Sequence, residues 1–199
     1  MTTELIDRPA VALPVDPLAH ALADIDGWPE PVTNAPIEAE AKTKDLVIVN
    51  WSGELDRVWP TLILASTAAA SGFRCRVFVT FWGLLPFVRD GVRITGENWM
   101  QRMLSFMQRP GIDHLRLSKM NFLGMGPWMI GRLRRQYGVA SPRELLEACQ
   151  ALGVEFIPCQ MSMDMFGIKR DDLIDGMAEP AGAATAIEIM TEANASLFI

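Results

Sequence analysis

The chain has 199 residues and a mass of 22.0 kDa, which is enough for one ordinary domain and a tail but not for two full-sized domains. Half of the residues are hydrophobic and 21% are charged, a balance that excludes a wholly disordered or fibrous protein. The net charge of the chain is −6, and residues 1–43 alone have this net charge because they contain 8 acidic and 2 basic residues. Residues 89–143, in contrast, carry 10 basic and 3 acidic residues. Charge is therefore polarised along the chain.

Residues 1–43 differ in composition from the rest of the sequence. They contain six of the 13 prolines and show no sustained helical or strand period, so we predict an acidic arm that is disordered or extended. We expect the folded domain over residues 44–199. No segment reaches the roughly 20 apolar residues that cross a bilayer, and no secretory signal is visible, so we expect a cytoplasmic protein.

Strands and helices alternate in the first part of this domain. The apolar run 46–49 predicts a strand that is buried on both faces. Residues 55–71 follow with apolar side chains at helical spacing, and Gly72 is expected to end that helix. Residues 77–81 are the predicted second strand. Because a strand, a helix and a strand form a crossover, we predict a parallel sheet.

Residues 89–140 interrupt this alternation as a basic and aromatic insertion, in which Trp99, Met103, Phe106 and Met107 share one face of a predicted helix. Alternation then resumes. Ser141 is the predicted N-cap of a helix that begins with proline and has glutamate at its third position. The remaining predicted elements are a strand over 154–157, short and longer helices over 169–173 and 181–193, and a last strand over 196–199. This order predicts a doubly wound α/β sheet.

Cys159 is the best-placed reactive side chain. It stands at the carboxyl end of a predicted buried strand, where the sites of open α/β sheets collect. Residues 161–168 are expected to open a helix, whose first amides would favour the thiolate form of the cysteine. The alternative is that Cys159 is a small buried side chain without chemistry.

The other two cysteines are more simply interpreted as structural. Cys149 lies on the apolar face of a predicted helix. Cys75 stands between Arg74 and Arg76, and alternation predicts an inward thiol between solvent-facing guanidinium groups. In a reducing compartment all three cysteines are expected to be free thiols.

Several classes of chemistry lack their sequence signals. The two histidines, His20 and His114, lie in the arm and in the insertion, so hydrolases that need a histidine beside a nucleophile are poorly supported. Neither glycine-rich phosphate-binding signature occurs, and no two cysteines are separated by two residues. We therefore expect no cofactor and no resident metal, and no nucleic-acid partner either, because no known module interleaves the basic and aromatic residues.

A row of sulfur atoms begins at Cys159 and continues at alternate positions with Met161, Met163 and Met165. In an extended segment these four side chains would point to one side, and soft sulfur ligands suit Cu(I). The alternative is that flexible methionines fill a core or an oligomer contact. A Cu(I)-binding module and a non-catalytic assembly subunit therefore stay open as functions.

Four ordered motifs carry a resemblance to a known family. They are VNWSGELD at 49–56, FWGL at 81–84, LSKMNFLGMG at 117–126 and CQMSMDMFGI at 159–168. Over about residues 44–199 the chain resembles the DsrE/DsrF/DsrH-like family of small sulfur-transfer proteins, and in particular its longer, methionine-rich branch. The acidic arm lies outside the resemblance.

The resemblance implies a DsrE-like three-layer α/β sandwich with a mostly parallel, about five-stranded sheet and an inserted helical segment. It also implies a sulfur carrier or sulfurtransferase that holds sulfane sulfur as a persulfide on Cys159. Such a carrier needs a thiolate that partner thiols can reach, but no acid–base pair. The positions expected to shape the substrate site are Gly83, Asn121, Gly124, Gly126, Ser162 and Asp164.

Partners follow from the same resemblance. It implies a homo-oligomer, as a trimer or hexamer, together with sulfur donors of the rhodanese type and acceptors of the TusA type. Residues 117–135 are the candidate contact with a membrane surface, because basic residues flank an uncharged stretch of aromatic and methionine side chains there.

Overall fold

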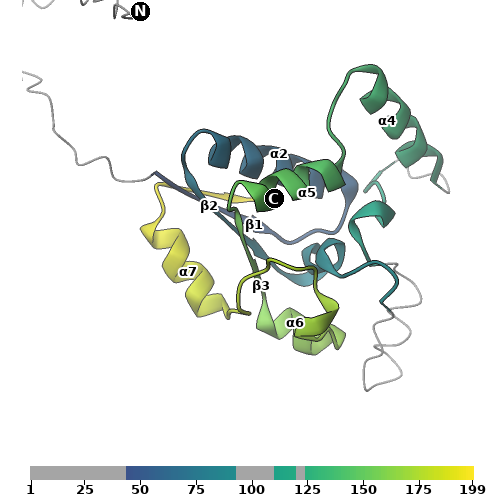
Figure 1. Ribbon diagram of the computed structural model, residues 1–199. Coiled ribbons are helices and arrows are strands. Elements are labelled where there is room, and N and C mark those ends of the chain that lie inside the picture. The colour runs from purple at the N-terminus through teal and green to yellow at the C-terminus, as the bar shows by residue number, and fades with distance from the viewer. Residues whose placement is uncertain (1–43, 93–109, 120–123) are drawn as a thin grey trace, which may run out of the picture. The chain divides into compact units, whose positions relative to one another are not determined.

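Figure 1 shows the computed structural model, which describes residues 44–92, 110–119 and 124–199. These residues lie within one compact unit, Lys42–Ile199. Four strands form a single sheet in the order β3-β2-β1-β4, and each neighbouring pair is parallel. The strands are β1 (Asp45–Asn50), β2 (Arg74–Val79), β3 (Glu155–Pro158) and β4 (Ala195–Phe198).

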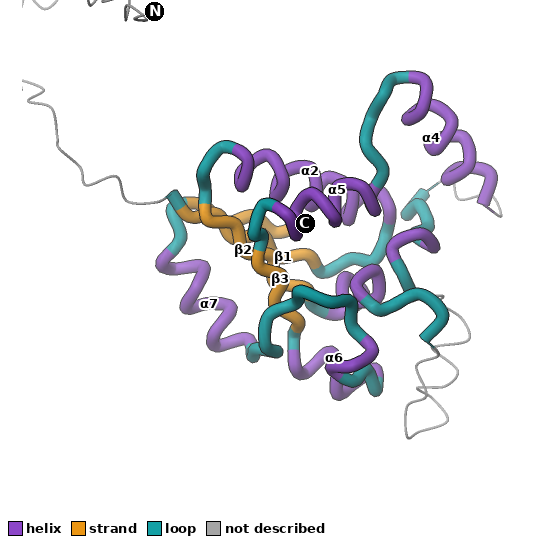
Figure 2. Tube along the Cα trace, in the orientation of Figure 1, coloured by secondary structure: helices purple, strands orange, loops and turns teal. Residues whose placement is uncertain are grey.

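Helices cover both faces of the sheet, as the colouring in Figure 2 makes clear. On one face α2 (Leu55–Ala70) packs beside α5 (Pro142–Ala151), and on the other lies α7 (Ala183–Glu192). The predicted three-layer α/β architecture is therefore confirmed. The further helices of the described residues are α4 (Met125–Gln136), α6 (Gln160–Phe166) and the short 3-10 helices η1 (Phe81–Phe87), η2 (Ile112–His114) and η4 (Arg170–Asp172).

The core is divided by the sheet because successive strand residues point to opposite faces. In β1, Ile48 packs with Leu62 of α2, whereas Val47 and Val49 pack beneath Ile189 of α7. The side chains of Val47, Ile48, Val49 and Leu62 are apolar and at most 5% exposed. Each such side chain stabilises the fold by roughly 1.5–3 kcal/mol. This two-sided burial explains why the run 46–49 is apolar without alternation.

The two helices on the first face begin and end as the sequence predicts. Gly72 has a φ of 81° just beyond α2, a conformation that glycine adopts without the strain of a Cβ atom. At the start of α5, the Ser141 hydroxyl accepts from the Glu144 amide at 3.2 Å, and the Glu144 carboxylate accepts from the Ser141 amide at 2.6 Å. The predicted capping box is confirmed.

The second strand lies earlier than predicted. β2 ends at Val79, and Phe81, which we expected inside the strand, instead has a φ of 50° and opens η1. A Cβ atom on Gly83 would lie 2.3 Å from the main-chain oxygen of Asn50, so only glycine lets η1 fold back against the end of β1. This close approach draws the chain out of the sheet after Thr80, a feature that apolar patterning does not encode.

Arg76 is not solvent-facing as expected. Its side chain is 5% exposed and forms an ion pair with Asp45, whose side chain is 15% exposed. Alternation does place Arg74 and Arg76 on one side of β2, but α7 covers that side at Arg76, whose guanidinium also donates to the Ile189 carbonyl at 3.4 Å. The expected inward thiol is confirmed, since Cys75 is 2% exposed.

A segment between α6 and α7 extends the sheet beyond β3. It forms isolated parallel bridges from Met177 to Phe156 and from Ala181 to Cys159. The amides of Ala178 and Ala181 donate to β3 carbonyls at 2.8 and 2.9 Å. The described residues thus hold four continuous strands, and this segment occupies the place of a fifth.

The predicted insertion is described only in part. Its predicted helix with Trp99, Met103, Phe106 and Met107 lies outside the described residues. Helix α4 leaves Met125, Trp128, Met129 and Leu133 between 44% and 61% exposed. Among the helices that the structure describes, none combines the length and apolar character required to traverse a bilayer.

Candidate functional site

Three parallel strands end in register at one edge of the sheet. Asn50 of β1 pairs with Val79 of β2, and Val79 pairs with Pro158 of β3. The residues that follow at this carboxyl edge are therefore Trp51, Thr80 and Cys159. Sites of open parallel sheets collect at such an edge.

Cys159 joins β3 to α6. Its amide donates to the Val79 carbonyl at 2.9 Å, and its own carbonyl accepts from the Met163 amide at 3.0 Å, so the residue caps the helix. The helix expected to follow the strand is confirmed at Gln160–Phe166. The strand fixes one side of the cysteine and the first turn of α6 fixes the other.

Two hydroxyl groups surround the Cys159 thiol. Ser162 is fully buried, and its Oγ accepts from the Phe81 amide at 2.8 Å. The Oγ atoms of Ser162 and Thr80 lie 3.1 Å apart. Because the Phe81 amide supplies a proton to Ser162, the serine hydroxyl can direct its own proton elsewhere, including toward sulfur.

The Cys159 pKa is lowered from its ordinary value. Burial is the largest single influence and raises this pKa, but it is outweighed by hydrogen bonds from the hydroxyls of Ser162 and Thr80 and from the amides of Ser162 and Met161. Donors that point at sulfur stabilise its negative charge more than its neutral form. The surroundings of Cys159 therefore stabilise its thiolate more than water does for an ordinary cysteine.

We expected the Cys159 thiol to be accessible, and this expectation is wrong for the described conformation. Cys159 is 3% exposed and belongs to the apolar cluster between the sheet and α7, with Ile157 and Ala186. The main chain of Ala181 runs alongside it at the edge of the sheet. A partner can reach the sulfur only when one of these neighbours moves.

The other cysteines lie within the opposite layer and are protonated. Burial raises the pKa of Cys75 to about 11, with the charge of Asp45 as a second cause. Burial raises the pKa of Cys149 to about 12, with Cys75 as a second cause. The Cys149 thiol lies 3.5 Å from the Leu62 carbonyl, to which it donates. Core packing, the simpler interpretation of both residues, is confirmed by exposures of 2% and 0%.

The remaining predicted site residues do not form one cluster in the described structure. Ser162 lies beside Cys159, whereas Asp164 lies on the exposed side of α6, where it accepts from Gln160 at 2.7 Å. Gly83 packs against the end of β1. Gly124 caps α4 with a φ of 97°, Gly126 is buried in the first turn of that helix, and Asn121 lies outside the described residues.

The methionines after Cys159 do not line up. They lie on a helix rather than in an extended segment, so alternate side chains diverge by about 200°. Met161 and Met165 are 66% and 43% exposed, whereas Met163 is buried at 3%. The geometric premise of the Cu(I) hypothesis is therefore wrong. The described residues also contain no group of three or more His, Cys, Asp or Glu side chains suited to a metal ion.

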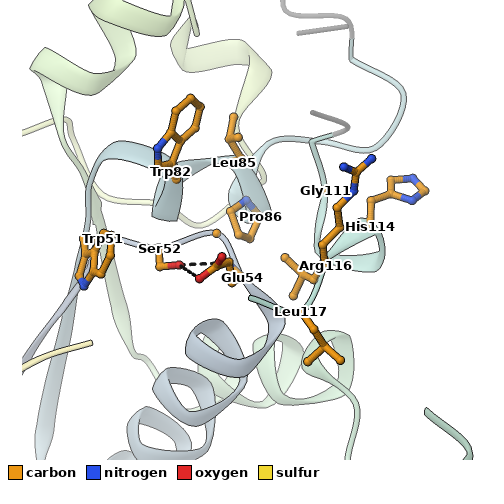
Figure 3. Close-up of a pocket in the computed structure, with 12 residues that line it drawn as sticks. Trp51, Ser52, Glu54, Trp82, Leu85, Pro86, Gly111, His114, Arg116 and Leu117 are labelled. Carbon is orange, nitrogen blue, oxygen red and sulfur yellow. Dashed lines mark hydrogen bonds between the residues drawn. The ribbon is translucent and has the colours of Figure 1, made fainter. Parts of the chain in front are cut away.

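A cavity of about 360 Å³ opens at the same carboxyl edge (Figure 3). The loop after β1 forms one wall with Trp51, Ser52 and Glu54, and η1 contributes Trp82. Arg116, from the segment after η2, lines the cavity as well. Cys159 is not among the lining residues, but η1 adjoins both places, because the residues before Trp82 contact Ser162.

Thr80 and this cavity were not identified from the sequence. Thr80 was placed inside a strand, and only the turn into η1 aligns its hydroxyl with Ser162. The motifs 49–56 and 81–84 did contain three of the cavity residues, Trp51, Glu54 and Trp82, so their shared position after parallel strands was the available signal.

Fold and site together define an α/β protein with a cysteine at the carboxyl edge of its parallel sheet, where hydrogen-bond donors stabilise the thiolate form of that cysteine. The model of the DsrE/DsrF/DrsH-like family matches residues 42–198. The chain belongs to this family.

Two relatives match nearly along their whole length. The sulfur carrier protein DsrE2 of Allochromatium vinosum is 38% identical over 159 residues, which are 78% of this chain and 98% of the relative. The uncharacterized protein YrkE of Bacillus subtilis is 34% identical over 158 residues, covering 79% and 98%. Among solved structures, the YchN protein of E. coli has a TM-score of 0.48 at 18% identity, covering 78% of this chain and 99% of its own.

Proposed function

We propose that this protein is a sulfur carrier that holds sulfane sulfur as a persulfide on Cys159 and passes it between thiols. The observation that carries the proposal is the lowered pKa of a buried cysteine surrounded by Ser162 and Thr80. Burial alone would raise that pKa, as it does for Cys149. Membership of the family and the relative named as a sulfur carrier support the same chemistry.

The transfer has two balanced steps. In the first, the Cys159 thiolate attacks the terminal sulfur of a donor persulfide, a new S–S bond forms, and the donor leaves as a thiolate. In the second, an acceptor thiolate attacks the terminal sulfur of the Cys159 persulfide, and Cys159 leaves as a thiolate. The hydroxyls of Ser162 and Thr80 stabilise that leaving charge, and no general base is required.

Burial of Cys159 means that a local movement must control access to its sulfur. Because Cys159 is 3% exposed, both steps require the sheet edge at Ala181, or the first turn of α6, to move away from the sulfur. The edge segment pairs with β3 only through isolated bridges, so it has fewer hydrogen bonds to break than a continuous strand. Between transfers the closed conformation would shield the persulfide from solvent and stray thiols.

Polysulfide loading followed by intact mass measurement tests the proposal. The wild-type chain is expected to gain the mass of one sulfur atom and to lose it again when an excess of a small thiol is added. Cys159→Ser should gain nothing, whereas the matched variant Cys149→Ser should load as the wild type does. Absence of loading on the wild type, or loading that persists in Cys159→Ser, would contradict the proposal.

A further inference from the structure

The cavity beside β1 is built from segments that are tied to one another. The Leu55 amide at the start of α2 donates to the Arg116 carbonyl at 2.8 Å, and the Ser118 amide donates to the Asp56 carboxylate at 2.9 Å. On the other side, the Gly111 amide donates to the Leu85 carbonyl at 3.0 Å. These bonds fix the walls without a ligand, as expected for a preformed site, and the volume of about 360 Å³ suits a small molecule.

Two opposite charges line this cavity without forming an ion pair among the described residues. Ser52, itself 2% exposed, donates to Oε2 of Glu54 at 3.2 Å and accepts from the Glu54 amide at 3.2 Å, which orients the carboxylate. Within the described ranges, neither Glu54 nor Arg116 forms an ion pair. In Figure 3 the Glu54 carboxylate lies between Trp51 on one side and Arg116 on the other. The site therefore offers separate positions for a cation and an anion.

Unpaired charges of both signs restrict the ligand. A purely anionic ligand, such as a nucleotide, would meet the Glu54 carboxylate, and a purely cationic one would meet Arg116. A zwitterion satisfies both groups at once. The indole rings of Trp51 and Trp82 also line the cavity and present apolar surface, against which a methylene or sulfur group packs favourably.

We propose that this cavity binds a small zwitterionic thiol of the glutathione type, with an ammonium group beside Glu54 and a carboxylate beside Arg116. The zwitterionic character follows from the two unpaired charges. The choice of a thiol among zwitterions rests on the proposed function, for which such a molecule would be the low-molecular-weight donor or acceptor of sulfur.

Calorimetric titration of the full chain with reduced glutathione tests the inference. Saturable binding at one site is expected. Glu54→Gln keeps an oxygen for Ser52 but removes the charge, and Arg116→Gln removes the opposite charge, so each should weaken binding about tenfold. The matched controls Glu147→Gln on α5 and Arg135→Gln on α4, both exposed and outside the cavity, should bind like the wild type.

A second ligand tests the contribution of the ammonium group alone. N-acetylglutathione lacks that charge, so it should bind the wild type about tenfold more weakly than glutathione and should bind Glu54→Gln no more weakly than glutathione does. The inference is overturned if glutathione does not saturate the protein at millimolar concentration, or if the two cavity variants bind it like the two controls.

The cavity and the carrier cysteine are tested separately. Cys159→Ser is expected to bind glutathione normally although it takes up no sulfur. Glu54→Gln is expected to load sulfur from inorganic polysulfide normally although it binds glutathione weakly. Loss of glutathione binding in Cys159→Ser would overturn a binding site that excludes this cysteine, whereas a failure of polysulfide loading in the wild type would contradict the carrier function alone.

Discussion

The carboxyl edge of the sheet and the layer between the sheet and helices α2 and α5 shift the pKa of a buried cysteine in opposite directions. Cys159 at the edge is 3% exposed, and Cys75 and Cys149 in the layer are 2% and 0% exposed, so burial scarcely distinguishes them. Yet the pKa of Cys159 is lowered, whereas the pKa values of Cys75 and Cys149 are raised to about 11 and about 12.

The difference lies in the donors around the sulfur. At the edge, hydroxyls of Ser162 and Thr80 and the first amides of α6 point at Cys159. In the layer, the Cys149 thiol donates to the Leu62 carbonyl, an acceptor that holds the thiol proton in place. The end of a parallel strand supplies amides and turn residues, whereas its middle supplies apolar side chains, so a reactive thiol belongs at the end.

The largest expected effect is a difference in alkylation rate among the three cysteines. Iodoacetamide should modify Cys159 at least about a hundredfold faster than Cys75 or Cys149, because movement at the sheet edge exposes the first and only unfolding exposes the others. Peptide mass spectrometry of the partly modified protein gives the three rates. In denaturant the rates should become similar, and similar rates in the native protein would break the comparison.

The next effect is a dependence of stability on alkaline pH. The unfolded chain releases the protons of Cys75 and Cys149 near their ordinary pKa, whereas the folded chain keeps them to about 11 and about 12, so stability falls as pH rises between these values. Between pH 8 and 10 the wild type should lose about 1 kcal/mol per thiol that the double variant Cys75→Ser/Cys149→Ser does not lose. Denaturant unfolding at each pH measures the difference.

Cys159 should act with the opposite sign in the same experiment. Its folded pKa lies below the unfolded one, so its contribution to stability is present above the unfolded pKa and is lost as pH falls through the folded pKa. Cys159→Ser should therefore be less stable than the wild type at alkaline pH by more than at neutral pH. Parallel stability curves for all three proteins would contradict the assigned pKa directions.

The smallest effect concerns the hydroxyl donors. Ser162→Ala removes a hydrogen bond to the thiolate, so the pKa of Cys159 should rise and its alkylation rate at neutral pH should fall severalfold. The midpoint of the rate against pH is expected to move upward. Ser66→Ala in α2, whose hydroxyl bonds only within its own helix, is the matched control. A midpoint that stays in place in Ser162→Ala would remove the serine from the account.

Local signals in the sequence were sufficient for most elements of the fold. The burial of β1 from Val47 onward, the capping box at Ser141 and the glycine after α2 each depend on neighbouring residues, and each is confirmed. The position of Cys159 after β3 also followed from a single apolar run. Such signals are local because capping, periodicity and strand burial act over a few residues.

Features that depend on contacts between residues far apart in the chain could not be predicted from the sequence. Thr80 reaches Ser162, 82 positions further on, only because η1 folds back, and Arg76 is buried only because α7 covers it. The exposure of Cys159 was misjudged for the same reason, since Ala181 closes the sheet edge from another part of the chain. Apolar patterning carries no information on such pairings.

The central claim, that Cys159 alone among the three thiols carries sulfur, is tested most directly by locating the sulfur in the wild-type protein. Polysulfide-loaded protein is alkylated, digested and examined by peptide mass spectrometry, with all three cysteines present. We predict the additional sulfur on the peptide that contains Cys159 and none on those that contain Cys75 or Cys149. Sulfur on either core cysteine, or spread evenly over the three, would contradict the account.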